Sequence, residues 1–339
     1  MAKFKEWEKT EIKTSDGKKQ AITPLILSVS RSTDVPAFFT EWFLNRLKEG
    51  YARWINPFNQ QPQYISFEKA KAAVFWSKNP QPLLDRLDEL DNYGIGYYFQ
   101  FTLCDYEKEG LEPNVPPMEK RIETFKKLSQ KLGKEKVIWR FDPFLLGDGL
   151  KIEDLLEKVK RVGDRLNPFT EKLVISFIDI DCYKKVKNNL QRHGNFRELN
   201  LSEKNEMALQ LKEMNREWNL EISTCAEGID LDKFDIKPNR CIDGSLLAKL
   251  FPEKKELMEF LGVQKSLFSS LGSDFSEDDL KDKGQREACG CIVSKDIGAY
   301  NTCPHLCRYC YANSTKGIVL KNFKNHSSSQ PGITKPGLI

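Results

Sequence analysis

Three cysteines near the C-terminus have a spacing that suits metal chemistry. They lie in the segment Cys303-Pro-His-Leu-Cys307-Arg-Tyr-Cys310-Tyr311, so three and then two residues separate them. A tight loop can bring three such sulfurs to one metal centre. A closed structural zinc site takes four ligands, whereas a four-iron, four-sulfur (4Fe-4S) cluster held by three cysteinates keeps one iron open. The spacing therefore predicts a metal centre with one position left for chemistry.

The motif, with the aromatic Tyr309 directly before its last cysteine, resembles the cluster motif of the radical S-adenosylmethionine enzymes. The resemblance implies that the open iron binds the amino and carboxylate groups of S-adenosylmethionine. One electron then cleaves this cofactor to methionine and a 5'-deoxyadenosyl radical. The resemblance also places Tyr309 beside the adenine. In that superfamily the motif lies near the start of a barrel domain, whereas here it lies at the end.

Longer segments resemble an uncharacterised bacterial family, domain of unknown function 1848, which is marked by a radical-SAM-like cysteine cluster at its C-terminal end. The segments that carry this resemblance are Ser30-Arg-Ser-Thr-Asp-Val-Pro36, Phe75-Trp-Ser-Lys-Asn-Pro80 and residues 288–303. The similarity runs from about Ile26 to Asn313. It implies a cluster and a cofactor, but no substrate.

Four further thiols are candidate metal ligands: Cys225, Cys241, Cys289 and Cys291. Together they are enough for a second iron-sulfur cluster or a tetrahedral zinc, and the alternative is a set of free buried thiols. Cys289 or Cys291 could instead be the fourth ligand of a zinc ion held by the three C-terminal cysteines. Cys104 and Cys182 are isolated, and we expect them in the core.

The chain that must position these cysteines alternates short apolar strands with amphipathic helices. Strands are predicted at 24–30, 72–77, 96–103, 136–141, 172–178 and 220–224, and helices at 37–48, 83–90, 118–132, 152–166, 182–192 and 203–218. Nearly continuous apolar strands are typical of a parallel sheet that is buried on both faces. We expect an α/β protein with a full or partial TIM-like β/α barrel. An open doubly wound sheet is the alternative, weakened because no G-x-G-x-x-G fingerprint follows the first strand.

The predicted domain organisation has four parts. Residues 1–23 form a polar lead-in, 24–284 the barrel, 285–314 the cluster-binding loop and 315–339 a flexible tail. If the cluster works on a substrate in the barrel mouth, the loop must fold back over that mouth from the far end of the chain.

Polar side chains follow the predicted strands at the rim where functional groups gather in β/α barrels. The candidates for catalysis are Arg140, Lys78 and Asp34, and those for holding the cofactor are Tyr309, Arg31, Asn79 and Glu227. Arg140 or Lys78 could neutralise a carboxylate, which a guanidinium binds in a bidentate manner. Glu227 could bind the amino group or the ribose hydroxyls. Asp34 precedes a helix, so a capping role is an equally good interpretation.

Composition narrows the class of protein. The 339 residues carry a formal net charge of +4, which is too mild to indicate a nucleic-acid-binding protein. The N-terminus has charge without an apolar run behind it, and no apolar stretch approaches the roughly 18 residues that span a bilayer. We therefore expect a cytoplasmic protein with no membrane partner, in which clustered cysteines indicate metal binding or catalysis.

Together these features predict a radical S-adenosylmethionine-type enzyme that acts on a substrate enclosed by the barrel and takes electrons from a ferredoxin or flavodoxin-like donor. The expected cofactors are a 4Fe-4S cluster and S-adenosylmethionine, with either a second iron-sulfur cluster or zinc. The alternative is a non-catalytic metal protein, in which zinc or an iron-sulfur cluster attaches the C-terminal segment to the barrel. A nucleic-acid lesion enzyme is a third interpretation, disfavoured by the weak net charge.

Overall fold

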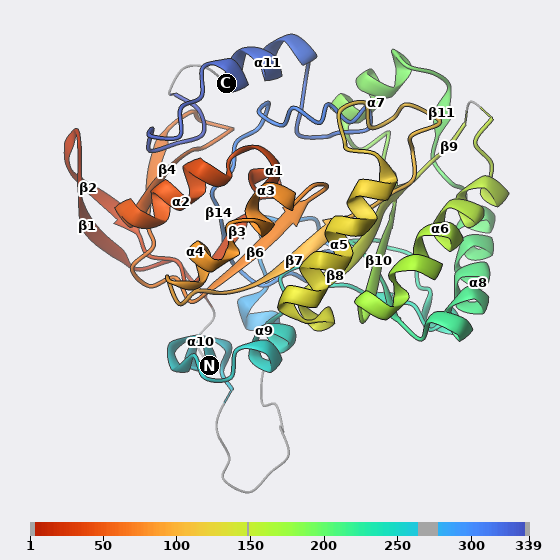
Figure 1. Ribbon diagram of the computed structural model, residues 1–339, viewed down its shortest axis with the longest axis horizontal. Helices are drawn as coiled ribbons and strands as arrows, with labels where there is room; N and C mark the ends of the chain where they lie inside the picture. The colour runs from red at the N-terminus through yellow and green to blue at the C-terminus, as the bar shows by residue number, and fades with distance from the viewer. Residues whose placement is uncertain (1–3, 148, 264–276, 336–339) are drawn as a thin grey trace, which may run out of the picture.

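An eight-stranded parallel sheet forms the centre of the computed structural model, which describes residues 4–147, 149–263 and 277–335 (Figure 1). The strand order is β13-β12-β10-β8-β7-β6-β3-β14. The strands are β3 (Ile26–Val29), β6 (Ala72–Ser77), β7 (Gly96–Thr102), β8 (Val137–Phe144), β10 (Lys172–Phe177), β12 (Glu221–Thr224), β13 (Lys237–Pro238) and β14 (Lys295–Asp296). All seven strand pairings are parallel, so the carboxyl ends of the strands lie at one edge.

Helices that connect the strands cover one face of the sheet, and two short helices from the C-terminal part of the chain cover the other together with residues 289–293. The helices are α1 (Val35–Phe38), α2 (Thr40–Glu49), α3 (Gln81–Leu84), α4 (Leu87–Asp91), α5 (Met118–Leu132), α6 (Ile152–Leu166), α7 (Lys184–Gln191), α8 (Leu201–Trp218), α9 (Gly244–Leu250), α10 (Lys255–Leu261) and α11 (Lys316–Lys324). In α5, the residues Ile122, Phe125 and Leu128 are fully buried at helical spacing and join the core formed with alternate sheet residues. On the other face, Val74 and Tyr98 pack against α9, α10 and residues 289–293.

The six predicted strands and the helices between them are confirmed within a few residues. Each strand is buried on both faces, which is why its sequence is nearly continuously apolar. A closed barrel is not formed in the described residues, because the edge strands β13 and β14 pair only with β12 and β3. Each edge strand is only two residues long, so it offers little backbone for closure. The fold is α/β with a large parallel sheet.

A second sheet lies beside the first and was not predicted. It has the order β1-β2-β5-β4, with β1 (Lys9–Thr14), β2 (Gly17–Ile22), β5 (Pro62–Ser66) and β4 (Tyr51–Ile55). The predicted polar lead-in therefore contains a β-hairpin, while residues 1–3 lie outside the described residues. A third, two-stranded pairing joins β9 (Leu146–Gly147) to β11 (Phe196–Arg197).

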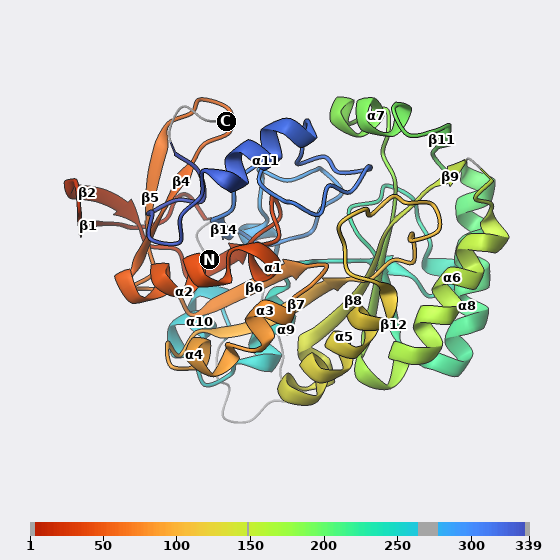
Figure 2. The same cartoon turned by 45° about the horizontal axis from the view of Figure 1, so that its top comes forward.

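The C-terminal segment, predicted to be a flexible tail, forms α11 and then packs against α2 and β4 (Figure 2). The Trp42 indole donates to the Gln330 carbonyl at 3.0 Å, and the Arg53 amide donates to the Pro331 carbonyl at 2.7 Å. Phe323 of α11 also packs against the rings of Phe38 and Phe39, just ahead of α2, a contact that composition alone does not reveal. Residues 336–339 lie outside the described residues.

None of the described helices is long and apolar enough to cross a membrane.

Candidate active site

A cavity of about 300 Å³ opens at the carboxyl ends of the parallel strands. Its walls come from the turns after β3, β6, β10 and β12, from β8 and from the C-terminal cysteine loop. The polar and sulfur-bearing side chains that line it include Arg31, Thr33, Asp34, Lys78, Arg140, Asp142, Ser176, Cys225, Cys303, His305, Cys307, Tyr309 and Cys310. The three C-terminal cysteines thus border one cavity with most of the predicted rim residues.

Hydrogen bonds from other segments hold the cysteine loop in place. Asn114 contacts it three times: its backbone N–H donates to the His305 carbonyl at 3.2 Å, its Nδ2 donates to the Pro304 carbonyl at 2.8 Å, and its carbonyl lies 3.2 Å from His305 Nδ1. Within the loop, the Cys310 amide donates to the Cys307 carbonyl at 3.1 Å. The Asn313 side chain donates to the Cys303 carbonyl at 2.9 Å. The loop is therefore braced from both sides.

The three thiols are free and largely shielded from water. Burial raises the pKa of Cys303, Cys307 and Cys310 above that of an exposed thiol, although the charge of Lys78 partly offsets this for Cys307 and Cys310. A buried neutral thiol becomes a thiolate readily only when a cation binds it. Within the described residues, no three His, Cys, Asp or Glu side chains already surround one metal position.

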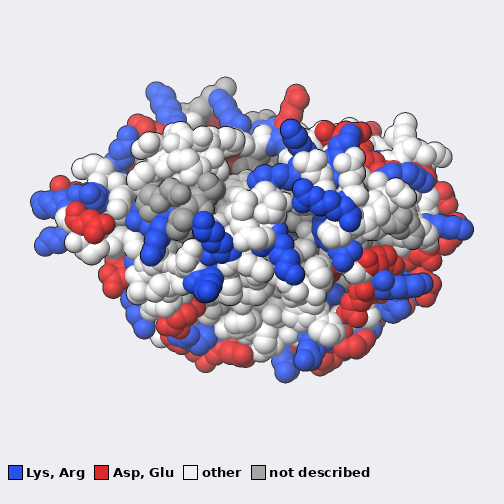
Figure 3. All heavy atoms as spheres, turned by 90° about the horizontal axis from the view of Figure 1, so that it is seen from above, with Lys and Arg blue, Asp and Glu red and all other residues white. Residues whose placement is uncertain are grey.

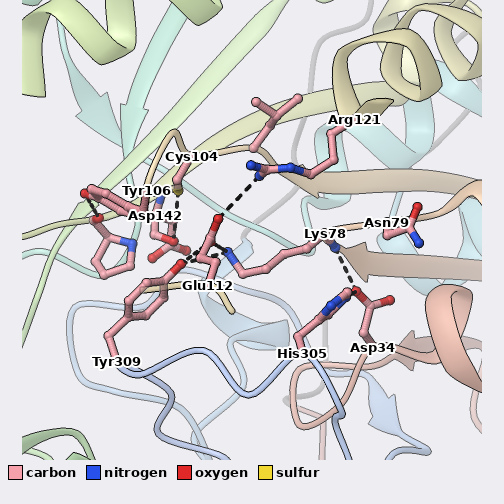
Figure 4. A network of polar contacts seen from close by, with 12 residues as sticks. Asp34, Lys78, Asn79, Cys104, Tyr106, Glu112, Arg121, Asp142, His305 and Tyr309 are labelled. Carbon is pink, nitrogen blue, oxygen red and sulfur yellow. Dashed lines mark hydrogen bonds and ion pairs between the residues drawn. The ribbon is translucent and has the colours of Figure 1, made fainter. Parts of the chain in front are cut away.

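Asp34 connects the ends of β3 and β6 to the cysteine loop (Figure 4). Its Oδ1 accepts hydrogen bonds from the Ala37 amide at 3.0 Å and the Ser77 hydroxyl at 2.7 Å. Its Oδ2 accepts from the Lys78 amide at 2.8 Å and lies 2.9 Å from His305 Nε2. Asp34 is thus the predicted helix cap and also supports the cysteine loop. Since both carboxylate oxygens are already bound, Asp34 acts as a positioning residue in this arrangement.

Lys78, Glu112 and Tyr309 form a buried polar network behind the loop (Figure 4). Lys78 Nζ lies 2.7 Å from Glu112 Oε1 and donates to the Tyr309 hydroxyl at 3.0 Å, and that hydroxyl also donates to Glu112. Arg121 approaches the other carboxylate oxygen at 3.4 Å. Burial disfavours the Glu112 charge, but Lys78 and Arg121 outweigh it and hold the pKa of Glu112 below its ordinary value. The network therefore fixes Tyr309, the aromatic residue of the motif.

Arg140 and Asp142 form a second pair within β8. Arg140 Nη2 binds Asp142 Oδ2, while Nη1 donates to Gln100 Oε1 at 3.1 Å and to Cys241 Sγ at 2.9 Å. The other Asp142 oxygen accepts from the Ser176 hydroxyl. Burial opposes the Asp142 charge, but Arg140 overcomes this and keeps the pKa of Asp142 below its usual range. The three polar residues that look costly inside apolar strands, Gln100, Arg140 and Ser176, are therefore mutually satisfied.

Arg31 has spare hydrogen-bonding capacity at the cavity wall. Its guanidinium lies 5.2 Å from the Trp76 ring, and Nη1 lies 3.8 Å from Asp282 Oδ2. Among the described residues, the buried Nη2 atom has no hydrogen-bond partner. The Arg31 amide is held by Asp296 Oδ2 at 2.8 Å, so the backbone that carries this side chain is fixed. An anion in the cavity could satisfy Nη2.

The remaining candidates lie elsewhere. Asn79 and Glu227 are not among the described residues that line the cavity, and Figure 4 shows Asn79 apart from the network. Glu227 is instead bound to the Phe177 amide at 2.9 Å and to Lys204 at 3.6 Å. Cys241, Cys289 and Cys291 are buried behind the cavity wall, next to Cys225.

The core prediction holds for only one of the two isolated cysteines. Cys104 is buried, whereas Cys182 is exposed in the turn before α7, so the prediction for Cys182 is wrong.

A family comparison fits this geometry. The sequence model described as "Domain of unknown function (DUF1848)" matches residues 26–312. The chain belongs to the DUF1848 family. The matched range contains all of the cavity-lining residues named above.

Other comparisons add little to the DUF1848 assignment. No curated protein matches this chain. Among solved structures, a provisionally assigned alpha-L-fucosidase from Bacteroides thetaiotaomicron is 13% identical, with 61% of this chain and 80% of that chain covered. Its TM-score is 0.24, so the likeness carries no argument about function.

Three residues of this DUF1848 site escaped the sequence analysis. Glu112 lies in a loop with no periodic pattern, and its partners are 34 and 197 positions away. Asp296 accepts hydrogen bonds from Ser30 Oγ at 2.7 Å and from the Arg31 amide, which joins β14 to the end of β3. Arg286 reaches Asp179 at the cavity wall. Arg286 and Asp296 could have been proposed from the sequence only because they are charged residues close to the cysteines, whereas nothing in the sequence singled out Glu112.

Proposed function

We propose that this DUF1848 protein is a radical S-adenosylmethionine-type enzyme whose 4Fe-4S cluster is held by Cys303, Cys307 and Cys310. The observation that supports the proposal most is the position of these thiols, which line one cavity at the carboxyl ends of parallel strands. Three cysteinates leave one iron of such a cluster free for S-adenosylmethionine. When bound, the two cofactors supply a 5'-deoxyadenosyl radical that abstracts a hydrogen atom from a substrate.

The donor set fits an iron-sulfur cluster better than a hard cation. Thiolates are soft ligands that select iron-sulfur clusters, zinc or copper, whereas carboxylates suit magnesium and calcium. The side chains of His305 and Asp34 are next to the thiols, but they bind one another at 2.9 Å. That leaves the three thiols of the loop as the free donors on this wall.

Arg31 is the best candidate among the lining residues for the carboxylate of S-adenosylmethionine. Its buried Nη2 lacks a partner within the described residues, and a guanidinium binds a carboxylate strongly. Arg140, by contrast, already binds Gln100, Cys241 and Asp142, so it would position Asp142 instead. The Asp142 carboxylate, which is 29% exposed, could then accept a hydrogen bond from the cofactor's amino group.

Apolar side chains would exclude water from the reacting atoms. Trp76, Phe177, Ile178 and Val186 line the same cavity as the cysteines. An enclosed apolar wall protects a reactive carbon radical from side reactions with solvent. Tyr309 lines the cavity as well, and its hydroxyl is held by Lys78 and Glu112. Its ring would border the adenine.

The position of β14 in the sheet explains how a cysteine motif near the C-terminus can reach the cavity. β14 pairs with β3 in parallel, so it occupies the place before the first strand of the βα series. The cysteine loop follows β14 at the carboxyl edge of the sheet. We propose that it is a permuted equivalent of the loop that follows the first strand in the superfamily.

An acidic electron donor of the ferredoxin or flavodoxin kind would suit the surface around the cavity. Figure 3 shows that Lys and Arg side chains predominate across the middle of this face. Helices α7 and α11, which lie on it in Figure 1, contain six lysines between them, Lys184, Lys185, Lys187, Lys316, Lys321 and Lys324, and no Asp or Glu. Complementary charge speeds the encounter of two proteins. The protein would work in the cytoplasm, where reduced donors are available.

Iron binding tests the assignment of ligands. Protein purified without oxygen is expected to be brown and to contain about four irons and four sulfides per chain. Replacing Cys303, Cys307 and Cys310 with serine should remove both, while Cys182→Ser, an exposed thiol in the turn before α7, should not. A colourless protein with zinc in the three-cysteine loop would favour the alternative of a non-catalytic metal protein.

A further inference from the structure

A second group of four cysteines extends from Cys225, which lines the cavity, to three thiols buried behind the cavity wall. It joins three segments: Cys225 at the end of β12, Cys241 after β13, and the pair Cys289 and Cys291 ahead of β14. Cys225 Sγ lies 3.5 Å from Cys241 Sγ. The side chain of Cys241 contacts that of Cys291, which in turn contacts that of Cys289. Four thiols from distant parts of the chain thus form one continuous row.

The protein surrounds two of these sulfurs with hydrogen-bond donors. Cys241 Sγ accepts from Arg140 Nη1 at 2.9 Å and from Asn239 Nδ2 at 3.3 Å. Cys291 Sγ accepts from the backbone amides of Cys241 at 3.2 Å and Ile242 at 3.4 Å. Four N–H donors, one of them cationic, thus already point at two sulfurs that a metal ion could bind as thiolates. Hydrogen bonding among the thiols together with burial keeps the pKa of Cys241 and Cys291 above its ordinary value, so a bound cation is needed to hold them ionised.

The spacing of the sulfurs favours one metal ion over a cluster. Zinc binds thiolates at about 2.3 Å, so the sulfurs of a tetrahedral site lie about 3.8 Å apart. The 3.5 Å separation of Cys225 and Cys241 is close to that edge length. In a 4Fe-4S cluster each cysteine binds a different iron, which places the cysteine sulfurs much further from one another.

We propose that Cys225, Cys241, Cys289 and Cys291 bind a single zinc ion as four thiolates. The four sulfurs contact in a row and do not yet surround one position, in line with the lack of a ready metal site among the described residues. Binding therefore requires the outer pair, Cys225 and Cys289, to turn toward the ion. A tetrathiolate zinc site carries net negative charge, and Arg140 and Arg31 are the nearby cations that would balance it.

The site would connect the cysteine segment to the sheet independently of the cavity chemistry. Residues 289–293 cover one face of the sheet and lead directly into β14 and the C-terminal loop. A zinc ion here would fix that segment to the ends of β12 and β13. It would also fix Arg140, whose other amino group holds Asp142 at the cavity wall.

Metal analysis of paired variants tests the proposal. Wild-type protein should contain about one zinc per chain, and the double variant Cys289→Ser/Cys291→Ser should lose it. The triple variant Cys303→Ser/Cys307→Ser/Cys310→Ser should keep its zinc, whatever happens to the iron. Cys182→Ser is the matched control with an exposed thiol.

Cobalt provides a measurement that does not depend on a variant folding. Wild-type protein produced with Co²⁺ in place of zinc should show the intense thiolate-to-cobalt absorption of a tetrahedral sulfur site. Wild-type protein without zinc and without these bands would overturn the proposal. A double variant that loses iron and sulfide while its zinc content stays unchanged would also overturn it, in favour of a second iron-sulfur cluster.

Discussion

Glu112 is the side chain on which the position of Tyr309 depends. Its carboxylate is 2% exposed and interacts with Lys78, Tyr309 and Arg121. Removing one member of a buried ion pair leaves the other charge without compensation, which costs more than the pair itself contributes. Glu112 is therefore a stability determinant as well as a positioning residue.

We expect Glu112→Gln to lower the free energy of unfolding by about 3 kcal/mol, because Lys78 and Arg121 keep their charges in a buried site. Urea denaturation would measure the loss. The matched control is Glu119→Gln, which removes a carboxylate that pairs with Arg165 at the surface and should have little effect.

The same variant should flatten the acid limb of the stability profile. The pKa of Glu112 is lower in the folded protein than in the unfolded chain, so its contribution is present above about pH 4.3 and is lost as the pH falls through the folded value. Wild-type protein should lose more stability on acidification than Glu112→Gln. If the free energy of unfolding of wild type and of Glu112→Gln changes with pH in the same way, the folded protein does not hold Glu112 in its charged form.

Arg31 should contribute directly to cofactor affinity, because its Nη2 has no partner among the described residues. A hydrogen bond to a charged group contributes about 1.5–3 kcal/mol, so Arg31→Ala should weaken S-adenosylmethionine binding roughly 10- to 100-fold. Equilibrium dialysis with the reconstituted protein would measure this. Asn79→Ala should bind normally, since that residue does not line the cavity. If Arg31→Ala and wild type bind S-adenosylmethionine equally well, a residue other than Arg31 binds the carboxylate of the cofactor.

At the scale of elements, the joint between β14 and β3 places the cysteine loop. Asp296 accepts hydrogen bonds from Ser28 Oγ at 2.9 Å and Ser30 Oγ at 2.7 Å, and it also holds the Gly298 amide at 2.8 Å. A Cβ atom on Gly298 would overlap Ser30 Oγ. The short strand β14 therefore depends on a glycine at the point where the chain leaves it.

We expect Gly298→Ala to destabilise the protein by about 1–3 kcal/mol, because the added methyl group forces this joint apart. Gly317→Ala is the control, since a Cβ there meets nothing within 4 Å and the residue lies in α11. It should be neutral or stabilising by about 0.5–1 kcal/mol. Thermal unfolding of both variants would show whether the loss of stability comes from the clash of the new methyl group with Ser30 or from replacing a glycine in general.

Sequence patterns predicted the elements that are buried on both faces and missed those that are not. The strands β3, β6, β7, β8, β10 and β12 have nearly continuous apolar runs, so they were recognisable from the sequence. In β1, exposed and partly buried residues alternate in a polar sequence, and β14 is only two residues long, so neither has a distinctive pattern. The tail gave no clear signal because several of its contacts with α2 and β4 use its backbone carbonyls, which the sequence does not reveal.

The candidate site was predictable where position along a strand decides it. Arg140 reaches the cavity from within β8, and Lys78 reaches it because it directly follows the carboxyl end of β6. Asn79 lies one residue beyond Lys78 and does not line it, since strand position alone does not fix the direction of a side chain in the following turn. Glu112 could not be found, because its role comes from contacts between distant segments.

At the scale of the whole molecule, the face that carries α7 and α11 combines positive charge with exposed apolar groups. Ile318, Leu320 and Phe323 are about two-fifths exposed on α11, between lysines at both ends of the helix. The Asn189 side chain of α7 donates to the Cys310 carbonyl at 3.3 Å, so this face adjoins the cysteine loop. We expect a protein donor to dock on it.

We expect the double charge reversal Lys321→Glu/Lys324→Glu to slow turnover with a flavodoxin donor about tenfold at low salt, because like charges would then oppose the encounter. Turnover with dithionite, a small chemical reductant, should be unchanged. Lys13→Glu, on the exposed hairpin strand β1, serves as the control. If the double variant slows turnover equally with flavodoxin and with dithionite, these lysines do not act by binding the protein donor.

We propose that three cysteines hold a cluster that cleaves S-adenosylmethionine in this cavity. The most direct measurement is the formation of 5'-deoxyadenosine by reconstituted, reduced protein under anaerobic conditions, followed by chromatography. We predict that wild-type protein produces 5'-deoxyadenosine and methionine, and that Cys307→Ser produces neither. A wild-type protein that contains a full 4Fe-4S cluster and binds S-adenosylmethionine, yet yields no 5'-deoxyadenosine on reduction, would contradict the proposed radical chemistry.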